Sequence, residues 1–374
     1  MAMNFKEGRW NHEINVTDFV KTNITPYEGD ASFLVGPTER TKAVWNKCLE
    51  ALAEERANNG VRSLDPSTVS TITSFAPGYI DKENEVIVGL QTDEVLRRAI
   101  KPFGGIKVVE KACRENGVEV DPKVKDIFTH YRKTHNDVVF DAYTEEIRSF
   151  RSLGFLTGLP DNYARGRIIG DYRRLALYGL DRLIEAKQND LRHLTGPMTD
   201  ARIRLREEVA EQIKALKEIK IMGEQYGLEL GRPAHNAQEA VQWVYMAYLA
   251  AVKEQDGAAM SLGNVSSFLD IYIEYDMAHG LLDEAHAQEL IDQFVIKLRM
   301  VRHLRMQAYT DIFAGDPTWV TESIGGRFND GRTKVTKTSF RFLQTLYNLG
   351  PSPEPNLTVL WSPELPEGFK NFCA

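Results

Sequence analysis

Cysteine is scarce in this chain, and the three cysteines that occur stand far apart. Cys48, Cys113 and Cys373 form no Cys-x-x-Cys pair within the 374 residues, so a disulfide framework and a cysteine zinc site are both disfavoured. Cys48 and Cys113 stand beside apolar neighbours in stretches that are predicted to be helical, where a free cysteine is more often a small core residue than a nucleophile. We therefore expect structural cysteines and a reducing compartment.

Long apolar runs and an excess of positive charge are also missing. No run approaches the roughly 18 apolar residues that cross a bilayer, and residues 1–10 lack the apolar core of a secretory signal. The 53 acidic and 46 basic residues give a formal charge of -7 and are mixed along the chain. This pattern offers no basic footprint, so we expect neither nucleic acid nor a membrane as a partner.

The common catalytic signatures are missing as well. The sequence contains no Gly-x-Gly-x-x-Gly, P-loop, His-Glu-x-x-His or Gly-x-Ser-x-Gly motif. Its eight histidines are dispersed, and the spacing of His130 and His135 places them poorly on one helical face. Nucleotide-dependent chemistry and a metal site are therefore disfavoured. The composition, 43% hydrophobic and 26% charged, still allows a large buried core.

Helical periodicity is clear in several stretches. A capped amphipathic helix is predicted over 39–57, and a longer one over 200–223 that should lie on the outside. The stretch 240–252 follows a capping-box pattern and is apolar on almost every face, so that helix must be buried. Another helix is predicted over 283–306, with arginines toward its C-terminal end that complement the helix dipole.

Short apolar runs bounded by turn residues lie between these helices. They predict buried strands over 86–90, 154–159, 258–262 and 357–361. Strands that alternate with long helical segments favour an α/β arrangement in which the strands are parallel and helices pack around them.

Four arginines lie within ten residues, between Arg165 and Arg174. Guanidinium groups beside glycine turns can fork onto a carboxylate or a phosphate, which indicates a possible anion site around Arg165 and Arg167. The alternative is that the arginines pair with Asp161, Asp171 and helix carboxylates. Sequence spacing leaves both interpretations open.

A second cluster runs from Phe313 to Trp319, where aromatic side chains flank a turn. Such a loop can wall a ligand pocket, but aromatic residues are more often part of a core. The small residues from Ala258 to Met260, at a predicted strand, have the same two interpretations. Neither alternative is excluded by the sequence.

A series of short runs, in order along nearly the whole chain, shares one resemblance. They are residues 25–30, 70–74, 87–92, 102–106, 131–136, 157–160, 165–174, 257–261, 315–326 and 350–356. Together they resemble the pyruvate formate-lyase family of glycyl radical enzymes. On this basis the chain is identified as a member of that family.

The resemblance implies a particular fold. The family has a ten-stranded α/β barrel made of two five-stranded halves, and residues 1–374 would form the N-terminal part. We therefore expect the first half of that barrel, a five-stranded parallel half-barrel with many surrounding helices. The family's adjacent cysteine pair and its C-terminal glycyl radical domain are expected to be absent from this chain.

The resemblance also implies a reaction. The family converts pyruvate and coenzyme A to acetyl-coenzyme A and formate, after an activating enzyme that uses S-adenosylmethionine has created a glycyl radical. Arg167 matches the arginine that binds the pyruvate carboxylate, and Trp319, Phe313 and Ala258 match apolar walls of the pocket. No catalytic residue, metal or glycyl radical is expected in these 374 residues, so the isolated chain should be inactive.

Some positions depart from the family pattern. They are Phe75, Pro77, Ser152 and Asn264. The first two lie near the family's coenzyme A region, and a related 2-oxo acid could replace pyruvate. The alternative function is a non-catalytic half-barrel that binds a 2-oxo acid or pairs with another subunit. Exposed strand edges predict a homo-oligomer, and the family implies the cytoplasm, or an organelle matrix or stroma after removal of a transit peptide.

Overall fold

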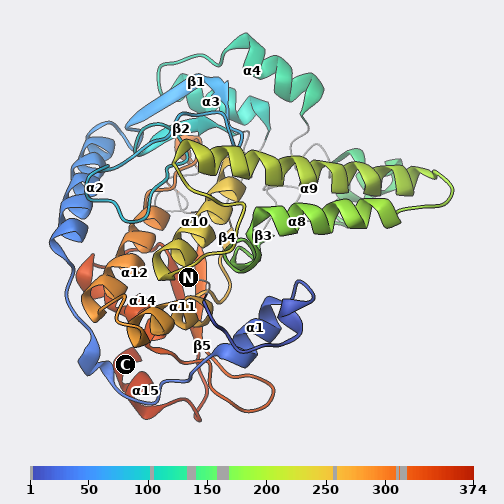
Figure 1. Ribbon diagram of the computed structural model, residues 1–374. Helices are drawn as coiled ribbons and strands as arrows, with labels where there is room; N and C mark the ends of the chain where they lie inside the picture. Colours follow the sequence, from blue (N-terminus) through green and yellow to red (C-terminus); the bar gives the residue numbers. More distant parts are fainter. Residues whose placement is uncertain are drawn as a thin grey trace.

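The computed structural model describes residues 3–101, 105–132, 140–157, 168–255, 259–308, 311 and 318–374. Within these ranges, helices enclose a small central set of strands (Figure 1). The helices are α1 (Val16–Asn23), α2 (Glu39–Ala57), α3 (Ile106–Glu115), α4 (Pro122–Asp126), α6 (Glu145–Ser152), α8 (Arg173–His193), α9 (Asp200–Gln225), α10 (Ala237–Glu254), α11 (Ser266–Ala278), α12 (Glu284–Arg299), α14 (Lys337–Asn348) and α15 (Glu367–Cys373).

The strands pair in parallel. They are β1 (Ser63–Val69) with β2 (Arg97–Ile100), β3 (Ile168–Ile169) with β4 (Met260–Ser261), and β5 (Thr321–Gly325) with β6 (Asn356–Leu360). A parallel bridge between Gly263 and Glu322 joins β4 to β5. The spatial order β3-β4-β5-β6 therefore runs through the centre of the molecule, which confirms the α/β prediction with parallel strands. The five-stranded half-barrel stays a prediction.

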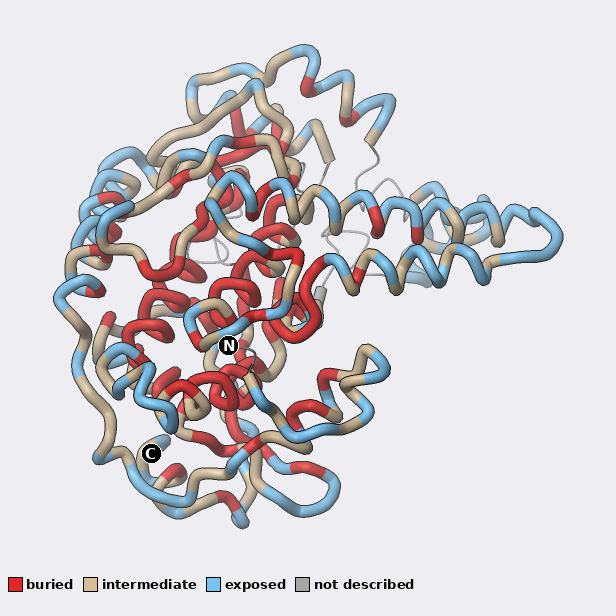
Figure 2. Tube along the Cα trace, in the orientation of Figure 1, coloured by how far each residue is buried: buried red, intermediate tan, exposed pale blue. Residues whose placement is uncertain are grey.

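The hydrophobic core lies around α10 and α12. Most side chains of α10 are buried, as the apolar sequence over 240–252 predicts. Its first turn is held by Asn236, whose side chain accepts the backbone N–H of Glu239 at 2.8 Å. Figure 2 shows the buried residues gathered in these central helices, whereas the α8–α9 hairpin projects from the body and is largely exposed.

Two of the other predicted helices agree with the structure, and one extends too far. Helix α2 covers 39–57 as predicted, and α9 contains 200–223 on the outside of the molecule. The prediction over 283–306 is wrong beyond Arg299, where α12 ends. Arg302 lies past that end: its backbone N–H binds the Gln91 side chain at 3.1 Å, and its guanidinium donates to the Arg299 carbonyl at 2.8 Å. Tertiary partners replace the helical hydrogen bonds there.

The stretch 86–90 is buried but is not a strand. Its backbone groups are bound by side chains of neighbouring helices instead of by another strand. Gln242 of α10 accepts the Val88 N–H at 2.7 Å and donates to the Val88 carbonyl at 2.9 Å, and Gln293 of α12 accepts the Val86 N–H at 2.7 Å. Amide side chains can both donate and accept, so they stand in for a β-partner.

The remaining strand predictions have different outcomes. Residues 154–157 form a turn and an irregular segment, so a strand is wrong there, and 158–159 lie outside the described residues. Gly154 has a φ of 77°, a conformation that suits a turn and not a strand. Strands β4 and β6 fall within the predicted runs 258–262 and 357–361, apart from the first residue of β6. The strands β1, β2, β3 and β5 have no counterpart in the prediction.

One buried ion pair joins α12 to the segment before residues 86–90. Lys297 Nζ lies 2.7 Å from Glu85 Oε2, and the two side chains are 1% and 0% exposed. The surrounding core excludes water, so either charge alone would be left without compensation.

We expect Lys297→Met to lower the free energy of unfolding by about 3–5 kcal/mol, because it leaves the Glu85 carboxylate buried without its cation. Urea denaturation measures this change. Lys42→Met is the matched control, since Lys42 forms an exposed pair with Glu39 at 2.7 Å, and it should change stability by less than about 1 kcal/mol. Equal losses of stability in the two variants would contradict the expectation that the buried Lys297–Glu85 pair matters more for folding than an exposed pair.

Candidate functional site

Of the four residues that the resemblance assigns to the pocket, only Trp319 is described by the structure. Arg167, Ala258 and Phe313 lie outside the described residues. Their sequence neighbours are informative nevertheless. Ile168 begins β3 directly after position 167, and Ala259 precedes β4 directly after position 258.

The starts of three parallel strands lie side by side. Ile168 of β3 is paired with Met260 of β4. Just before β4 and β5, the Ala259 N–H donates to the Thr318 carbonyl at 2.7 Å. Parallel strands point the same way, so the segments that enter β3, β4 and β5 meet at one end of the sheet. The described residues next to positions 167 and 258 are thereby brought close to Trp319.

The backbone at this end is strained at two non-glycine residues. Ala259 has a φ of 71° and Trp319 a φ of 52°, both in the left-handed region. This conformation costs roughly 1–2 kcal/mol for a residue with a side chain. The two residues enter adjacent strands and are joined through Thr318. Clustered backbone strain of this kind is typical of functional sites.

A buried carboxylate holds the strained turn. Glu354, which is 9% exposed, accepts the Trp319 N–H at 2.7 Å with Oε1 and the Val320 N–H at 2.9 Å with Oε2. Burial raises the pKa of Glu354 to about 7, against the opposing effect of these hydrogen bonds. The next strand begins at the same place, since the Asn356 N–H donates to the Val320 carbonyl at 2.7 Å.

A second buried carboxylate ties β5 to α11. Glu322 is fully buried, and its Oε1 accepts the Ser266 N–H at 2.9 Å and the Val265 N–H at 3.0 Å. A carboxylate at a helix N-terminus satisfies donors that have no partner within the helix. Burial raises the pKa of Glu322 to about 8, although both backbone hydrogen bonds act to lower it.

Part of the arginine cluster pairs with acids. Arg173 Nε lies 2.7 Å from Asp171, and Arg174 Nε lies 3.6 Å from the same carboxylate. For these two arginines the pairing alternative is confirmed. Arg173 also donates to the Asn264 carbonyl at 3.2 Å, so it braces the connection after β4. Arg165, like Arg167, lies outside the described residues.

The cysteines Cys48 and Cys113 are core residues, as the sequence predicts. Both are fully buried, in α2 and α3, and burial raises their pKa to about 12 and about 11. A thiol of such high pKa is a poor nucleophile at neutral pH. Cys373 is exposed in α15.

Residue-by-residue reasoning missed Glu322 and Glu354. Glu322 stands between Thr321 and Ser323 and Glu354 between two prolines, and neither setting is a motif that marks a glutamate as buried. The available signal was indirect, since Glu322 and Glu354 both lie within the runs 315–326 and 350–356 that carry the family resemblance.

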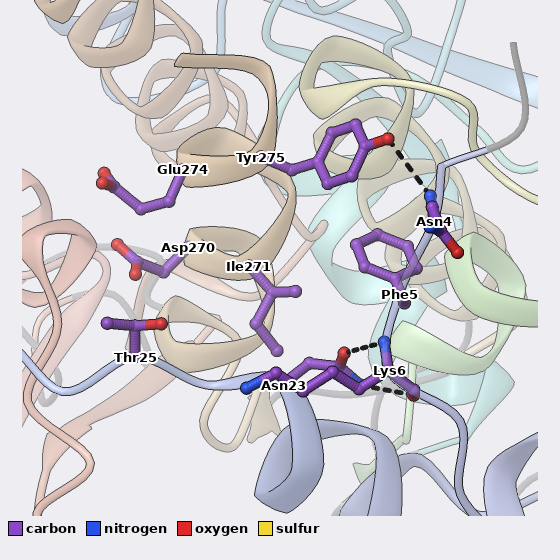
Figure 3. Close-up of a pocket in the computed structure, with 9 residues that line it drawn as sticks. All are labelled: Asn4, Phe5, Lys6, Asn23, Thr25, Asp270, Ile271, Glu274 and Tyr275. Carbon is purple, nitrogen blue, oxygen red and sulfur yellow. Dashed lines mark hydrogen bonds between the residues drawn. The ribbon is translucent and has the colours of Figure 1, made fainter. Parts of the chain in front are cut away.

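Two cavities formed by described residues lie away from Trp319. One of about 220 Å³ lies between the N-terminal segment, the end of α1 and one face of α11 (Figure 3). Its lining includes Lys6, Asn23 and Asp270, and the nearby Asn4 N–H donates to the Tyr275 hydroxyl at 3.1 Å. Trp319 does not line it. Within the described ranges no three His, Cys, Asp or Glu side chains are placed to hold a metal ion, and no helix is long and apolar enough to span a bilayer.

The fold of this chain is similar to the folds of two solved enzymes, one of which is a glycyl radical enzyme. A glycyl radical enzyme from Archaeoglobus fulgidus matches with a TM-score of 0.58 and 15% identity, over 95% of this chain and 49% of that chain. The glycerol-bound form of the B12-independent glycerol dehydratase from Clostridium butyricum matches with a TM-score of 0.68 and 18% identity, over 91% of this chain and 49% of that chain. At such low identity the likeness concerns the fold alone.

Sequence comparison shows the family to which the chain belongs. The model of the pyruvate formate lyase-like family matches residues 7–374, so the chain belongs to that family. A curated relative, formate acetyltransferase of Haemophilus influenzae, is 57% identical over 375 residues, which cover 99% of this chain and 49% of the relative. The chain therefore spans about half the length of that relative.

Glu322 should make stability depend on pH. Its pKa lies at about 8 in the folded chain against an ordinary value of 4.5, so the folded state keeps a proton that the unfolded state releases. Between these two values stability must fall as pH rises, by up to about 1.4 kcal/mol per pH unit for one proton. We expect Glu322→Gln to flatten the fall in melting temperature between pH 5 and 8.

Calorimetry at several pH values measures this effect. Glu367→Gln, at an exposed glutamate paired with Lys370, should leave the slope of the wild-type chain unchanged. An unchanged fall in the Glu322→Gln variant would contradict this expectation, because a carboxylate that is already ionised in the folded state adds no slope between pH 5 and 8.

Proposed function

We propose that this chain supplies the substrate-binding part of a formate acetyltransferase that converts pyruvate and coenzyme A to acetyl-coenzyme A and formate. The 57% identity to the Haemophilus influenzae relative carries this proposal. The convergence of the strand starts supports it, because residues next to positions 167 and 258 lie near Trp319. The site is a pocket for a small carboxylic acid.

Each pocket residue has a distinct part in the proposal. The Arg167 guanidinium binds the pyruvate carboxylate through two parallel N–H donors, which fixes the direction of the carbon–carbon bond that breaks. Trp319, Phe313 and Ala258 form apolar walls that keep water away from it. Apolar walls suit the methyl group of pyruvate, and a slightly larger 2-oxo acid such as 2-oxobutanoate is the closest competitor.

The 374 residues bind in this scheme but do not turn over alone. The reaction requires two adjacent cysteines and a radical glycine, and the three cysteines here stand singly. Activity would need the complementary part of the barrel, coenzyme A as co-substrate and the activating enzyme that uses S-adenosylmethionine. In this proposal the reaction takes place in the cytoplasm, with an organelle matrix or stroma as the alternative.

Arg167→Ala should weaken pyruvate binding at least 10-fold, because no other group replaces a forked guanidinium. Isothermal titration calorimetry of the 374-residue chain measures the dissociation constant. Arg174→Ala is the control, since Arg174 is half-exposed and lies by Asp171, and it should bind pyruvate as the wild type does. Equal weakening by both changes, or formate release by the wild-type chain after anaerobic activation, would contradict the proposal.

A pairing function is the second candidate, and the exposed end of β6 favours it. Among the described residues β6 pairs only with β5, and Leu360 and Trp361 are 42% and 67% exposed. An open strand edge beside exposed apolar side chains promotes association. We propose that the chain forms homo-oligomers through this edge when it is alone.

Light scattering should therefore give a mass above the 42.4 kDa of one chain. Replacing both Leu360 and Trp361 by lysine should shift the mass toward the monomer, because charge at a strand edge opposes pairing. Leu281→Lys is the matched control, at a leucine that is 70% exposed between α11 and α12. A wild-type monomer at micromolar concentration would refute the proposal.

A further inference from the structure

The backbone around Trp319 is connected to two other parts of the chain, residues 259–260 and 354–356. Thr318 accepts N–H groups of Ala259 and Met260 at 2.7 and 3.3 Å, and Val320 accepts the Asn356 N–H at 2.7 Å. The carbonyls of Thr318 and Val320 thus form strand-like hydrogen bonds with the starts of β4 and β6. The N–H groups of Trp319 and Val320 have a different partner, the Glu354 carboxylate.

This arrangement is a small anion-binding turn occupied by a side chain of the same protein. A residue in the left-handed conformation turns successive backbone N–H groups toward the same side, where they can share one anion. With φ of 52° at Trp319, its N–H and that of Val320 reach the two oxygens of Glu354 at 2.7 and 2.9 Å. The carboxylate therefore stabilises a conformation that tryptophan otherwise disfavours.

Glu354 is itself held rigidly by a buried arginine. Arg299, at the end of α12, donates to the carbonyls of Leu349, Gly350 and Glu354 at 3.2, 2.9 and 3.1 Å. Its guanidinium also lies over the Trp45 ring, 5.4 Å from the centroid. The loop that carries Glu354 is thereby fixed to the helical core on one side and to Trp319 on the other.

We propose that Glu354 is a positioning residue, whose carboxylate locks the Trp319–Val320 backbone and so sets the place of the Trp319 indole in the substrate pocket. The role of Trp319 as a pocket wall rests on the proposed function. The hydrogen bonds of Glu354 to the Trp319 and Val320 N–H groups, called the lock below, are contacts between described residues. Glu354 acts through Trp319 and does not touch the substrate in this scheme.

The lock can be tested without any ligand. The 374-residue chain labelled with 5-fluorotryptophan gives one fluorine resonance for each of its five tryptophans, and Trp319→Phe assigns the relevant one. Glu354→Gln replaces one acceptor oxygen by an NH₂ group that opposes a backbone N–H. We expect the Trp319 resonance to shift or broaden while those of Trp10 and Trp243 stay in place.

Glu354→Asp is the second variant, because it keeps the carboxylate but withdraws it by one methylene. It should displace the same resonance less than Glu354→Gln does. If Glu354→Gln does not fold, the Trp319 resonance of Glu354→Asp tests the proposal instead. Glu367→Gln is the control and should match the wild type. A Trp319 resonance that is unchanged in a folded Glu354→Gln or Glu354→Asp variant would overturn the proposal.

Pyruvate titration then separates the lock from the proposed function. If both are right, Glu354→Gln raises the pyruvate dissociation constant at least 10-fold and Glu354→Asp raises it less. If the wild-type chain binds no pyruvate but the resonance still moves, the proposed function fails and the lock stands. If the resonance moves and binding is unchanged, the lock is correct but does not shape the pocket, which refutes the second half of the proposal.

Discussion

The hydrogen bonds that join the entries of β4, β5 and β6 determine where the proposed substrate pocket of this chain lies. Thr318 binds the start of β4, and Val320 binds the start of β6. With both carbonyls engaged, the intervening Trp319 is left with a left-handed backbone whose N–H groups face Glu354. Without this register the segments that precede the strands would not meet, and the proposed pocket could not form at this end of the sheet.

Buried polar side chains connect that site to the rest of the molecule. Glu322 ties β5 to the first turn of α11, and Arg299 ties the end of α12 to the loop before β6. Gln242 and Gln293 likewise bind backbone N–H groups of the irregular segment 86–90. Each of these groups satisfies backbone atoms that would otherwise be buried without partners, which costs more than the hydrogen bond contributes. The apolar core thus supplies most of the stability, and the buried polar groups determine which strands and helices are aligned.

Much of the helical structure could be predicted from the sequence, because helix periodicity and caps are local. The N-cap and the apolar stripe are enough to predict the helix over 39–57, and composition is enough to predict the buried helix α10. The end of α12 was missed because the carbonyl of its last residue, Arg299, is bound by Arg302, whose position depends on contacts with Gln91 and Glu55.

The strands and the candidate site were harder to predict, because they depend on contacts between residues that are far apart in the chain. Residues 86–90 have the composition of a buried strand, but glutamine side chains take the place of the neighbouring strand. In β1, Pro66 argues against a strand from sequence alone. At the site, Trp319 was found through the family resemblance, whereas its strained backbone and its tie to Glu354 arise from residues 35 positions apart in the chain. Periodicity cannot reveal such contacts.

The central claim is that the strand entries gather Arg167 and Trp319 around one small carboxylic acid. A crystal structure of the 374-residue chain soaked with pyruvate tests this most directly. We predict that Arg167 forks onto the pyruvate carboxylate, that the Trp319 indole lies against the substrate, and that Glu354 accepts the Trp319 and Val320 N–H groups. An Arg167 side chain that instead turns to the surface and pairs with a neighbouring acid, away from Trp319, would contradict it.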